Sequence, residues 1–200
     1  FSTPSDYADV EFLEELGMPA YKIGSDDLTN YPFLEYIAKR QKPMIVSTGM
    51  CTLGEVEEAV ETILKTGNEQ LILLHCTVSY PPNIEDVNLN IIRTFQQAFN
   101  IPIGYSNHVA DIFIPVLAVA MGASAIEVHL TSDRGLEKPD YQVSLEPVEL
   151  KKMVQHIRLI SVVQGSTVKK IAKTEEKWRV NGRKSLIAAR NLKSGEILKR

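Results

Sequence analysis

Two histidines, His108 and His129, each close a short apolar segment, in "IPIGYSNH" and "AIEVHLTSD". If the two segments are neighbouring parallel strands, both imidazoles lie at the same edge of the sheet, because parallel strands end at a common edge. Two neutral imidazoles there suit a divalent transition metal whose shell is completed by water or a carboxylate. Histidines at strand ends are also often structural, so spacing alone leaves both interpretations open.

Lys22 is unusual because it lies inside the apolar segment "AYKIGS". A buried ammonium group needs an anionic partner. A lysine among hydroxyl groups suits a phosphate or carboxylate ligand, whereas an ion pair with Glu127, on the same strand face as His129, is the structural alternative. The hydroxyl groups expected at the same rim belong to Thr3, Ser25, Ser47 and Ser106.

Several further polar residues follow the apolar segments. Tyr80 in "TVSYPP" suits either a ligand contact or an anchor for the proline turn, and His75, between two apolar residues, is interpreted as a hydrogen-bonded core histidine. The loop carboxylates either contact sugar hydroxyls or form turns. These carboxylates are Asp26, Asp27 and Asp140.

The elements that position these residues alternate between strands and helices. Near-continuous apolar runs predict parallel strands that are buried on both faces. Strands separated by helices require a parallel sheet with right-handed crossovers. Polar residues close every strand, which favours a TIM (β/α)8 barrel over an open doubly wound sheet. The predicted strands span residues 20–25, 43–48, 71–77, 101–106 and 125–131.

The helices between the strands carry their own signals. The clearest is residues 52–67, where Thr52 and Glu55 have capping-box spacing and Gly67 is placed to end the helix. The remaining helical patterns span residues 31–40, 87–99, 112–122 and 146–165, and the opening "FSTPSD" resembles the end of a strand entering a helix.

The predicted elements define three regions. Five strands and a stub at Phe1 are too few for eight, and the chain opens without methionine, so we expect an N-terminally truncated barrel over residues 1–165. Residues 166–184 are charged and weakly periodic and indicate a linker that ends in a surface helix or coil. Residues 185–200 show a strand, a turn at "LKSGE" and a second strand, which predicts the beginning of another small domain.

Composition narrows the function classes. A formal net charge of -3 gives no strong basic field, which disfavours nucleic acid and anionic membranes as partners and favours a small molecule. No apolar run of about 18 residues and no signal peptide is present, so we expect a cytoplasmic protein. Cys51 and Cys76 lack cysteine-rich spacing and are expected to be reduced thiols.

Several ordered motifs together resemble the sialic acid synthase family, which comprises N-acetylneuraminate synthases and their legionaminate and pseudaminate relatives. They are "FSTP", "YKIGSDDLTNYPFLEYIAK", "KPMIVSTGM", "LLHCTVSYP", "EDVNL", "IPIGYSNH", "IEVHLTSDR" and "SLEP". The resemblance runs from residue 1 to about residue 165, and "RKSLIAARNLKSGEIL" resembles the start of that family's antifreeze-like (SAF) domain.

The resemblance implies a dimeric TIM-barrel enzyme that condenses phosphoenolpyruvate with an N-acetylated hexosamine, similar to N-acetylmannosamine, and releases phosphate. It implies that His108 and His129 hold a divalent metal, Mn²⁺ or else Mg²⁺ or Co²⁺, and act in catalysis with Lys22. The phosphoenolpyruvate site it implies comprises Thr3, Lys22, Ser25, Ser47 and Ser106. The sugar contacts it implies are Asp27, Tyr80 and Asp140.

Three departures from the family pattern leave the acceptor sugar open. Many relatives carry Gly-Glu at the positions of Asp26 and Asp27, asparagine at Val78, and histidine at Tyr141. Two alternatives therefore stand beside the synthase: a catalytically impaired homologue that binds a sugar or scaffolds an assembly, and another phosphoenolpyruvate-using, aldolase-type barrel.

Overall fold

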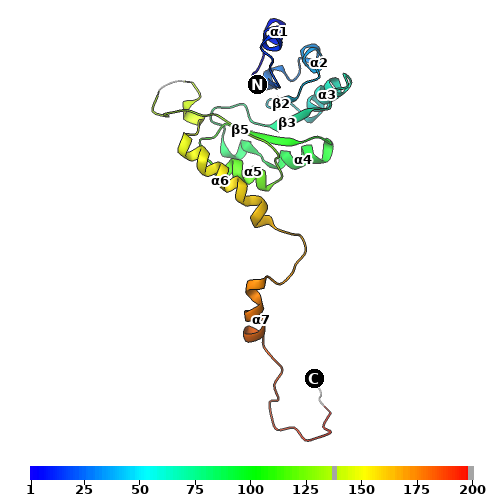
Figure 1. Ribbon diagram of the computed structural model, residues 1–200, viewed down its shortest axis with the longest axis vertical. Helices are drawn as coiled ribbons and strands as arrows, with labels where there is room; N and C mark the ends of the chain where they lie inside the picture. Colours follow the sequence, from blue (N-terminus) through cyan, green and yellow to red (C-terminus); the bar gives the residue numbers. More distant parts are fainter. Residues whose placement is uncertain (137–138, 198–200) are drawn as a thin grey trace. The chain divides into compact units, whose positions relative to one another are not determined.

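The architecture is one parallel sheet with helices between its strands (Figure 1). The structure, a computed structural model, describes residues 1–136 and 139–197 and divides into two compact units, Phe1–Val163 and Gln164–Arg200. In the described part of the first unit, the sheet follows chain order. Its strands are β1 (Tyr21–Ile23), β2 (Met44–Ser47), β3 (Leu71–His75), β4 (Ile103–Asn107) and β5 (Ile126–Val128).

The sequential strand order indicates a barrel-type sheet. A doubly wound sheet reverses its strand order at a switch point, whereas these strands pair in parallel with their neighbours in the chain. The two outer strands also meet across the interior of the curved sheet, where Lys22 Nζ of β1 lies 3.8 Å from Glu127 Oε2 of β5. The sheet is therefore a half-barrel, as the polar strand ends predict.

Helices connect the strands, and the capping residues predicted for the clearest of them are in place. In α3, Thr52 Oγ1 accepts a hydrogen bond from Glu55 N at 3.4 Å, while the Glu55 carboxylate accepts from Thr52 N at 2.7 Å. Gly67, with φ +83, lies beyond the end of this helix. The capping box is thus confirmed. The helices of the first unit are α1 (Tyr7–Glu15), α2 (Tyr31–Ala38), α3 (Leu53–Leu64), α4 (Asn90–Ala98), α5 (Phe113–Ala120) and α6 (Pro147–Gln164).

One helix begins later than predicted. The pattern placed a helix over residues 87–99, but a 3-10 turn, η2 (Ile84–Val87), comes first and is followed by Asn88 in the left-handed region at φ 39. A left-handed residue interrupts a right-handed helix, so α4 starts at Asn90.

No helix in the described residues is both long and apolar enough to cross a membrane.

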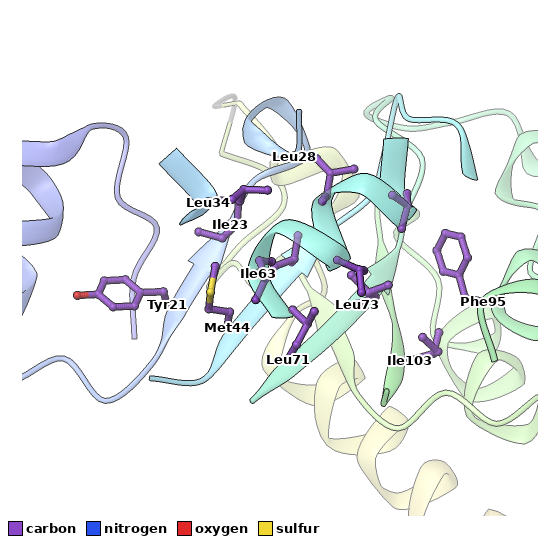
Figure 2. Packing of buried hydrophobic residues seen from close by; sticks show 14 of the residues in the cluster. Tyr21, Ile23, Leu28, Leu34, Met44, Ile63, Leu71, Leu73, Phe95 and Ile103 are labelled. Atoms are coloured by element: carbon purple, nitrogen blue, oxygen red, sulfur yellow. The ribbon is translucent and has the colours of Figure 1, made fainter. Parts of the chain in front are cut away.

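The core lies between the sheet and its helices (Figure 2). Met44 and Leu73 of the strands are fully buried in the same cluster as Ile63 of α3 and Phe95 of α4. Helices α4 and α5 contact β4. Truncating one such buried side chain to alanine costs about 2–5 kcal/mol, so this packing fixes the strand ends on which the pocket is built.

The second unit contains the predicted linker region. Within residues 166–184, the chain forms η4 (Lys173–Glu175) and the exposed helix α7 (Glu176–Gly182). The two strands predicted in 185–200 are absent from residues 185–197, where only the turn forms, with Glu196 N donating to Lys193 O at 3.1 Å. A hairpin without apolar surface to pack on is unstable, and Leu186 is fully exposed. Residues 198–200 lie outside the described residues.

Candidate functional site

A pocket of about 560 Å³ lies at the carboxyl ends of the strands. All of the residues predicted to bind an anion line it, together with both site histidines and Tyr80. The predicted anion ligands are Thr3, Lys22, Ser25, Ser47 and Ser106. Side chains from well-separated parts of the chain therefore face one small cavity, as expected for the strand ends of a parallel barrel.

The amino group of Lys22 lines this pocket. Its side chain is buried, and Nζ donates hydrogen bonds to Ser47 Oγ and Ile23 O, each at 2.7 Å. Burial lowers the pKa of Lys22 below its ordinary value, and the nearby Glu127 carboxylate opposes this effect. Lys22 thus lines the pocket and also neighbours Glu127, and its role toward an anionic ligand stays a prediction.

Glu127 and Ser25 link the strands around the lysine. Ser106 Oγ donates to Glu127 Oε1 at 2.7 Å, so one carboxylate contacts both β4 and the ammonium group of β1. Ser25 Oγ accepts from Gly49 N at 3.0 Å and lies 3.2 Å from Cys76 Sγ. A Cβ at Gly49 would lie only 2.9 Å from Ser25 Oγ, so the close approach requires glycine.

His108 is held in one orientation by the backbone. Its Nδ1 lies 2.7 Å from the carbonyl oxygen of Thr77, which can only accept a hydrogen bond, so Nδ1 carries the proton and Nε2 keeps its lone pair. Burial lowers the pKa of His108; the Thr77 carbonyl opposes the effect, and His129 adds to it. The ring is therefore neutral near pH 7, the form that binds metals.

The two site histidines are neighbours, as predicted. The ring centroids of His108 and His129 are 5.3 Å apart, and His129 Nδ1 lies 4.0 Å from Asp140 Oδ2. Imidazoles that share one ion through metal–nitrogen bonds of about 2.1 Å have centroids about 5 Å apart. The anchored Nδ1 of His108 is the usual arrangement of a metal-binding histidine.

The two site histidines supply only part of the coordination shell of a metal ion. Among residues 1–136 and 139–197, no group of three or more His, Cys, Asp and Glu side chains could hold a metal ion. The histidine pair supplies two nitrogen ligands, and a complete shell needs further oxygen donors such as water or substrate. The pair therefore suits an open, catalytic type of metal site rather than a closed structural one.

Tyr80 covers the two imidazoles. Its ring centroid lies 4.2 Å from that of His108 at an interplanar angle of 33°, and 5.7 Å from that of His129 at 88°. The phenol thus packs in a tilted arrangement against His108 and edge to face against His129, and the edge-to-face contact is one that aromatic rings prefer. No local sequence signal specifies this three-ring cluster.

The carboxylates are placed differently from the prediction. Asp27 does not line the pocket; its Oδ1 accepts from Asn30 Nδ2 at 3.2 Å, whereas the preceding Asp26 does line it. Both belong to the single turn η1 (Ser25–Asp27), in which adjacent side chains point in directions about 120° apart. Asp140, just before η3 (Tyr141–Val143), lies beside His129 but outside the pocket wall.

Two other sequence predictions have clear outcomes. His75 is buried, with Nε2 2.9 Å from Val87 O, which confirms a hydrogen-bonded core histidine. Cys51 and Cys76 are free thiols. Cys76 also lines the pocket, which sequence reasoning missed, although its position directly after β3 was a usable signal.

Fold and site together define a (β/α)-barrel-type protein with a small polar pocket at its strand ends. The chain belongs to the NeuB family, whose model matches residues 1–169.

The relatives agree with this assignment. An uncharacterised protein of Methanocaldococcus jannaschii is 48% identical and covers 98% of this chain and 58% of its own length. The N,N'-diacetyllegionaminic acid synthase of Campylobacter jejuni is 44% identical, over 98% of this chain and 59% of that protein. The chain thus spans a little over half the length of these relatives.

A solved structure supports the fold independently. The N-acetylneuraminic acid (sialic acid) synthetase of Leptospira borgpetersenii, in complex with citrate, superposes with a TM-score of 0.81 at 39% identity. The match covers 91% of this chain and 65% of that chain.

Proposed function

We propose that this protein condenses phosphoenolpyruvate with an N-acetylated hexosamine to give a sialic-acid-type nonulosonate and phosphate. One observation carries the proposal: a buried lysine among hydroxyl groups and a pair of imidazoles line the same pocket. The first feature suits a phosphorylated carboxylic acid, and the second suits activation of a carbonyl group. Membership of the NeuB family, with relatives named as nonulosonate synthases, supports the same reaction.

Lys22 is the residue that we assign to the charges of phosphoenolpyruvate. Its ammonium group donates to Ser47 Oγ and Ile23 O, and we assign its third N–H, which has Glu127 Oε2 nearby at 3.8 Å, to a phosphate or carboxylate oxygen. The hydroxyls of Thr3, Ser25 and Ser106 line the same pocket and are proposed to contact the substrate with it. Their role is to hold the substrate in line for attack, which is a positioning and electrostatic contribution.

His108 and His129 are the proposed ligands of a divalent metal, Mn²⁺ or alternatively Mg²⁺ or Co²⁺. When bound, such an ion supplies Lewis acidity toward a carbonyl oxygen. The contribution of the chain is the fixed proton on His108 Nδ1, which keeps Nε2 free as a ligand. Tyr80 and Asp140 flank this pair and are proposed to contact the sugar. Asp27 does not line the pocket and is not assigned.

The proposed reaction balances without a redox partner. Carbon 3 of phosphoenolpyruvate forms a bond to the aldehyde carbon of the open-chain sugar, and water adds to carbon 2. The bond between carbon 2 and the phosphate oxygen then breaks, phosphate leaves, and the oxygen of the added water becomes the keto oxygen. Lys22 and the surrounding hydroxyls hold the departing phosphate throughout.

The test is phosphate release by the intact protein with phosphoenolpyruvate, Mn²⁺ and a panel of amino sugars, with the keto acid detected by mass spectrometry. We expect release that depends on an N-acetylated hexosamine. No release with any amino sugar contradicts the proposal. Sugar binding without turnover would instead identify an impaired homologue, and preference for a simple sugar phosphate would identify a different aldolase-type barrel.

A further inference from the structure

A hydrogen bond from Gln142 joins two loops at the mouth of the pocket. Gln142 Nε2 donates to the carbonyl oxygen of Tyr80 at 2.6 Å, across 62 positions of the chain. Gln142 belongs to η3, which follows β5, whereas Tyr80 belongs to the loop after β3. The contact therefore ties together two strand ends that are not neighbours in the sheet.

The loop that carries Gln142 is itself firmly anchored. Val143 and Leu145 are almost completely buried, and Leu145 N donates to the carbonyl oxygen of His129 at 2.8 Å. The carbonyl oxygen of Asp140 accepts from Val143 N at 3.1 Å and from Ser144 Oγ at 2.8 Å. Gln142 is thus presented from a fixed turn next to His129, and it can hold a less buried segment in place.

Tyr80 lies in the less buried segment that Gln142 contacts. Its side chain is 39% exposed, yet its ring contacts both imidazoles. Fixing the backbone of an exposed residue reduces the number of ring positions it samples, so one hydrogen bond to its carbonyl affects the whole three-ring contact.

We propose that Gln142 is a positioning residue that holds the Tyr80 ring against His108 and His129 and thereby sets the affinity of the pocket for the acceptor sugar. The part concerning the sugar rests on the proposed function. A lost hydrogen bond of ordinary strength predicts a change of about three- to tenfold. The change falls on the KM for the sugar, because Tyr80 lies over the imidazoles, whereas Lys22 and its hydroxyls remain in place.

The kinetic test compares three substitutions of Gln142. Gln142→Ala and Gln142→Glu both remove the N–H donor, and we expect each to raise the sugar KM about three- to tenfold with the KM for phosphoenolpyruvate and kcat unchanged. Gln142→Lys restores an N–H donor of sufficient reach and should recover the wild-type KM. The control is Gln155→Ala, at an exposed position of α6. Equal sugar KM values in all variants and wild type would overturn the proposal.

A second measurement requires no activity. The chain has four histidines, so selective labelling gives few imidazole signals, and the Tyr80 ring shifts those of His108 by its ring current. We expect Gln142→Ala to move the His108 signal toward its position in Tyr80→Ala. A His108 signal that moves in Tyr80→Ala but not in Gln142→Ala would overturn the positioning role. A protein that fails to turn over but shows the expected shift would contradict only the proposed function.

Discussion

Lys22 on β1 and Glu127 on β5 lie 3.8 Å apart although their strands are the first and last in the order of the sheet. The contact is possible because the sheet curls into a half-barrel and brings both strand ends to one pocket. Glu127 also accepts a hydrogen bond from Ser106, so the carboxylate is oriented before any ligand binds. The Glu127 carboxylate raises the pH at which the Lys22 ammonium group loses its proton.

The first prediction concerns that charge. Burial lowers the pKa of Lys22 and the Glu127 carboxylate partly restores it, so Glu127→Gln lowers this pKa further. The ammonium group then loses its proton at a lower pH, and affinity for phosphoenolpyruvate declines earlier on the alkaline side. Calorimetric titration with phosphoenolpyruvate across the alkaline range measures the midpoint pH of this decline in affinity. Glu61→Gln, which removes an exposed carboxylate paired with Lys65, is the control and should not move it. An unchanged midpoint in Glu127→Gln would be incompatible with this role.

The second prediction concerns the histidine pair. His108→Ala removes one of two proposed nitrogen ligands, and we expect it to weaken Mn²⁺ binding by more than about 100-fold, because even the loss of a supporting partner costs 10–100-fold. Elemental analysis after dialysis measures the bound metal. His156→Ala, at an exposed position of α6, is the matched control and should retain full metal content. Equal metal content in both variants would refute the assignment.

The third prediction concerns pH-dependent stability. Burial lowers the pKa of His75 below the ordinary histidine value of 6.5, while backbone contacts at Val87 and Asn88 oppose the effect. Below pH 6.5 the unfolded chain therefore binds a proton at His75 that the folded chain resists, and the free energy of unfolding falls as the pH falls. One such group contributes a slope of at most about 1.4 kcal/mol per pH unit.

Denaturant unfolding between pH 7.5 and about pH 5 tests this behaviour. The aromatic side chains packed near His75, Phe95 and Tyr105, carry no charge in this range. His75→Gln should show a shallower loss of stability on acidification than the wild type. Parallel curves for the two proteins would show that His75 does not contribute.

The fourth prediction concerns the capping box of α3. Thr52→Ala removes the hydroxyl that accepts from Glu55 N, and we expect a loss of about 1 kcal/mol in the free energy of unfolding. Thr62→Ala, at a half-buried position in the interior of the same helix, should be neutral or slightly stabilising, since alanine is the better helix former. Equal stabilities of the two variants would mean that the cap contributes nothing.

The elements that the sequence predicts well are those with a local signal. Continuous apolar runs identify all five strands, and Thr52 with Glu55 locates the start of α3, because both patterns are properties of neighbouring residues. The pocket follows from the same logic: in a parallel barrel, polar residues at strand ends must converge. The sequence therefore predicts that Lys22 and the two site histidines lie together, and the three residues line one pocket.

The remaining features depend on contacts or directions that no local pattern encodes. Asp26 rather than Asp27 faces the pocket because of the orientation of one short turn. The contact of Tyr80 with the histidines, and its tie to Gln142, join segments that are distant in the chain. Within residues 185–197 the predicted strands do not form, for a related reason, since an isolated hairpin is stable only where a packing surface exists.

The binding of phosphoenolpyruvate by wild type, Lys22→Met and Lys65→Met is the most direct test that Lys22 forms the anion site. Both substitutions remove one positive charge, but Lys22 is buried in the pocket and Lys65 is exposed on the surface. Calorimetric titration of the intact protein should give equal affinities for wild type and Lys65→Met, and a loss of about 10- to 150-fold for Lys22→Met, the scale of a charge-assisted contact. Equal affinities for all three proteins would contradict the account.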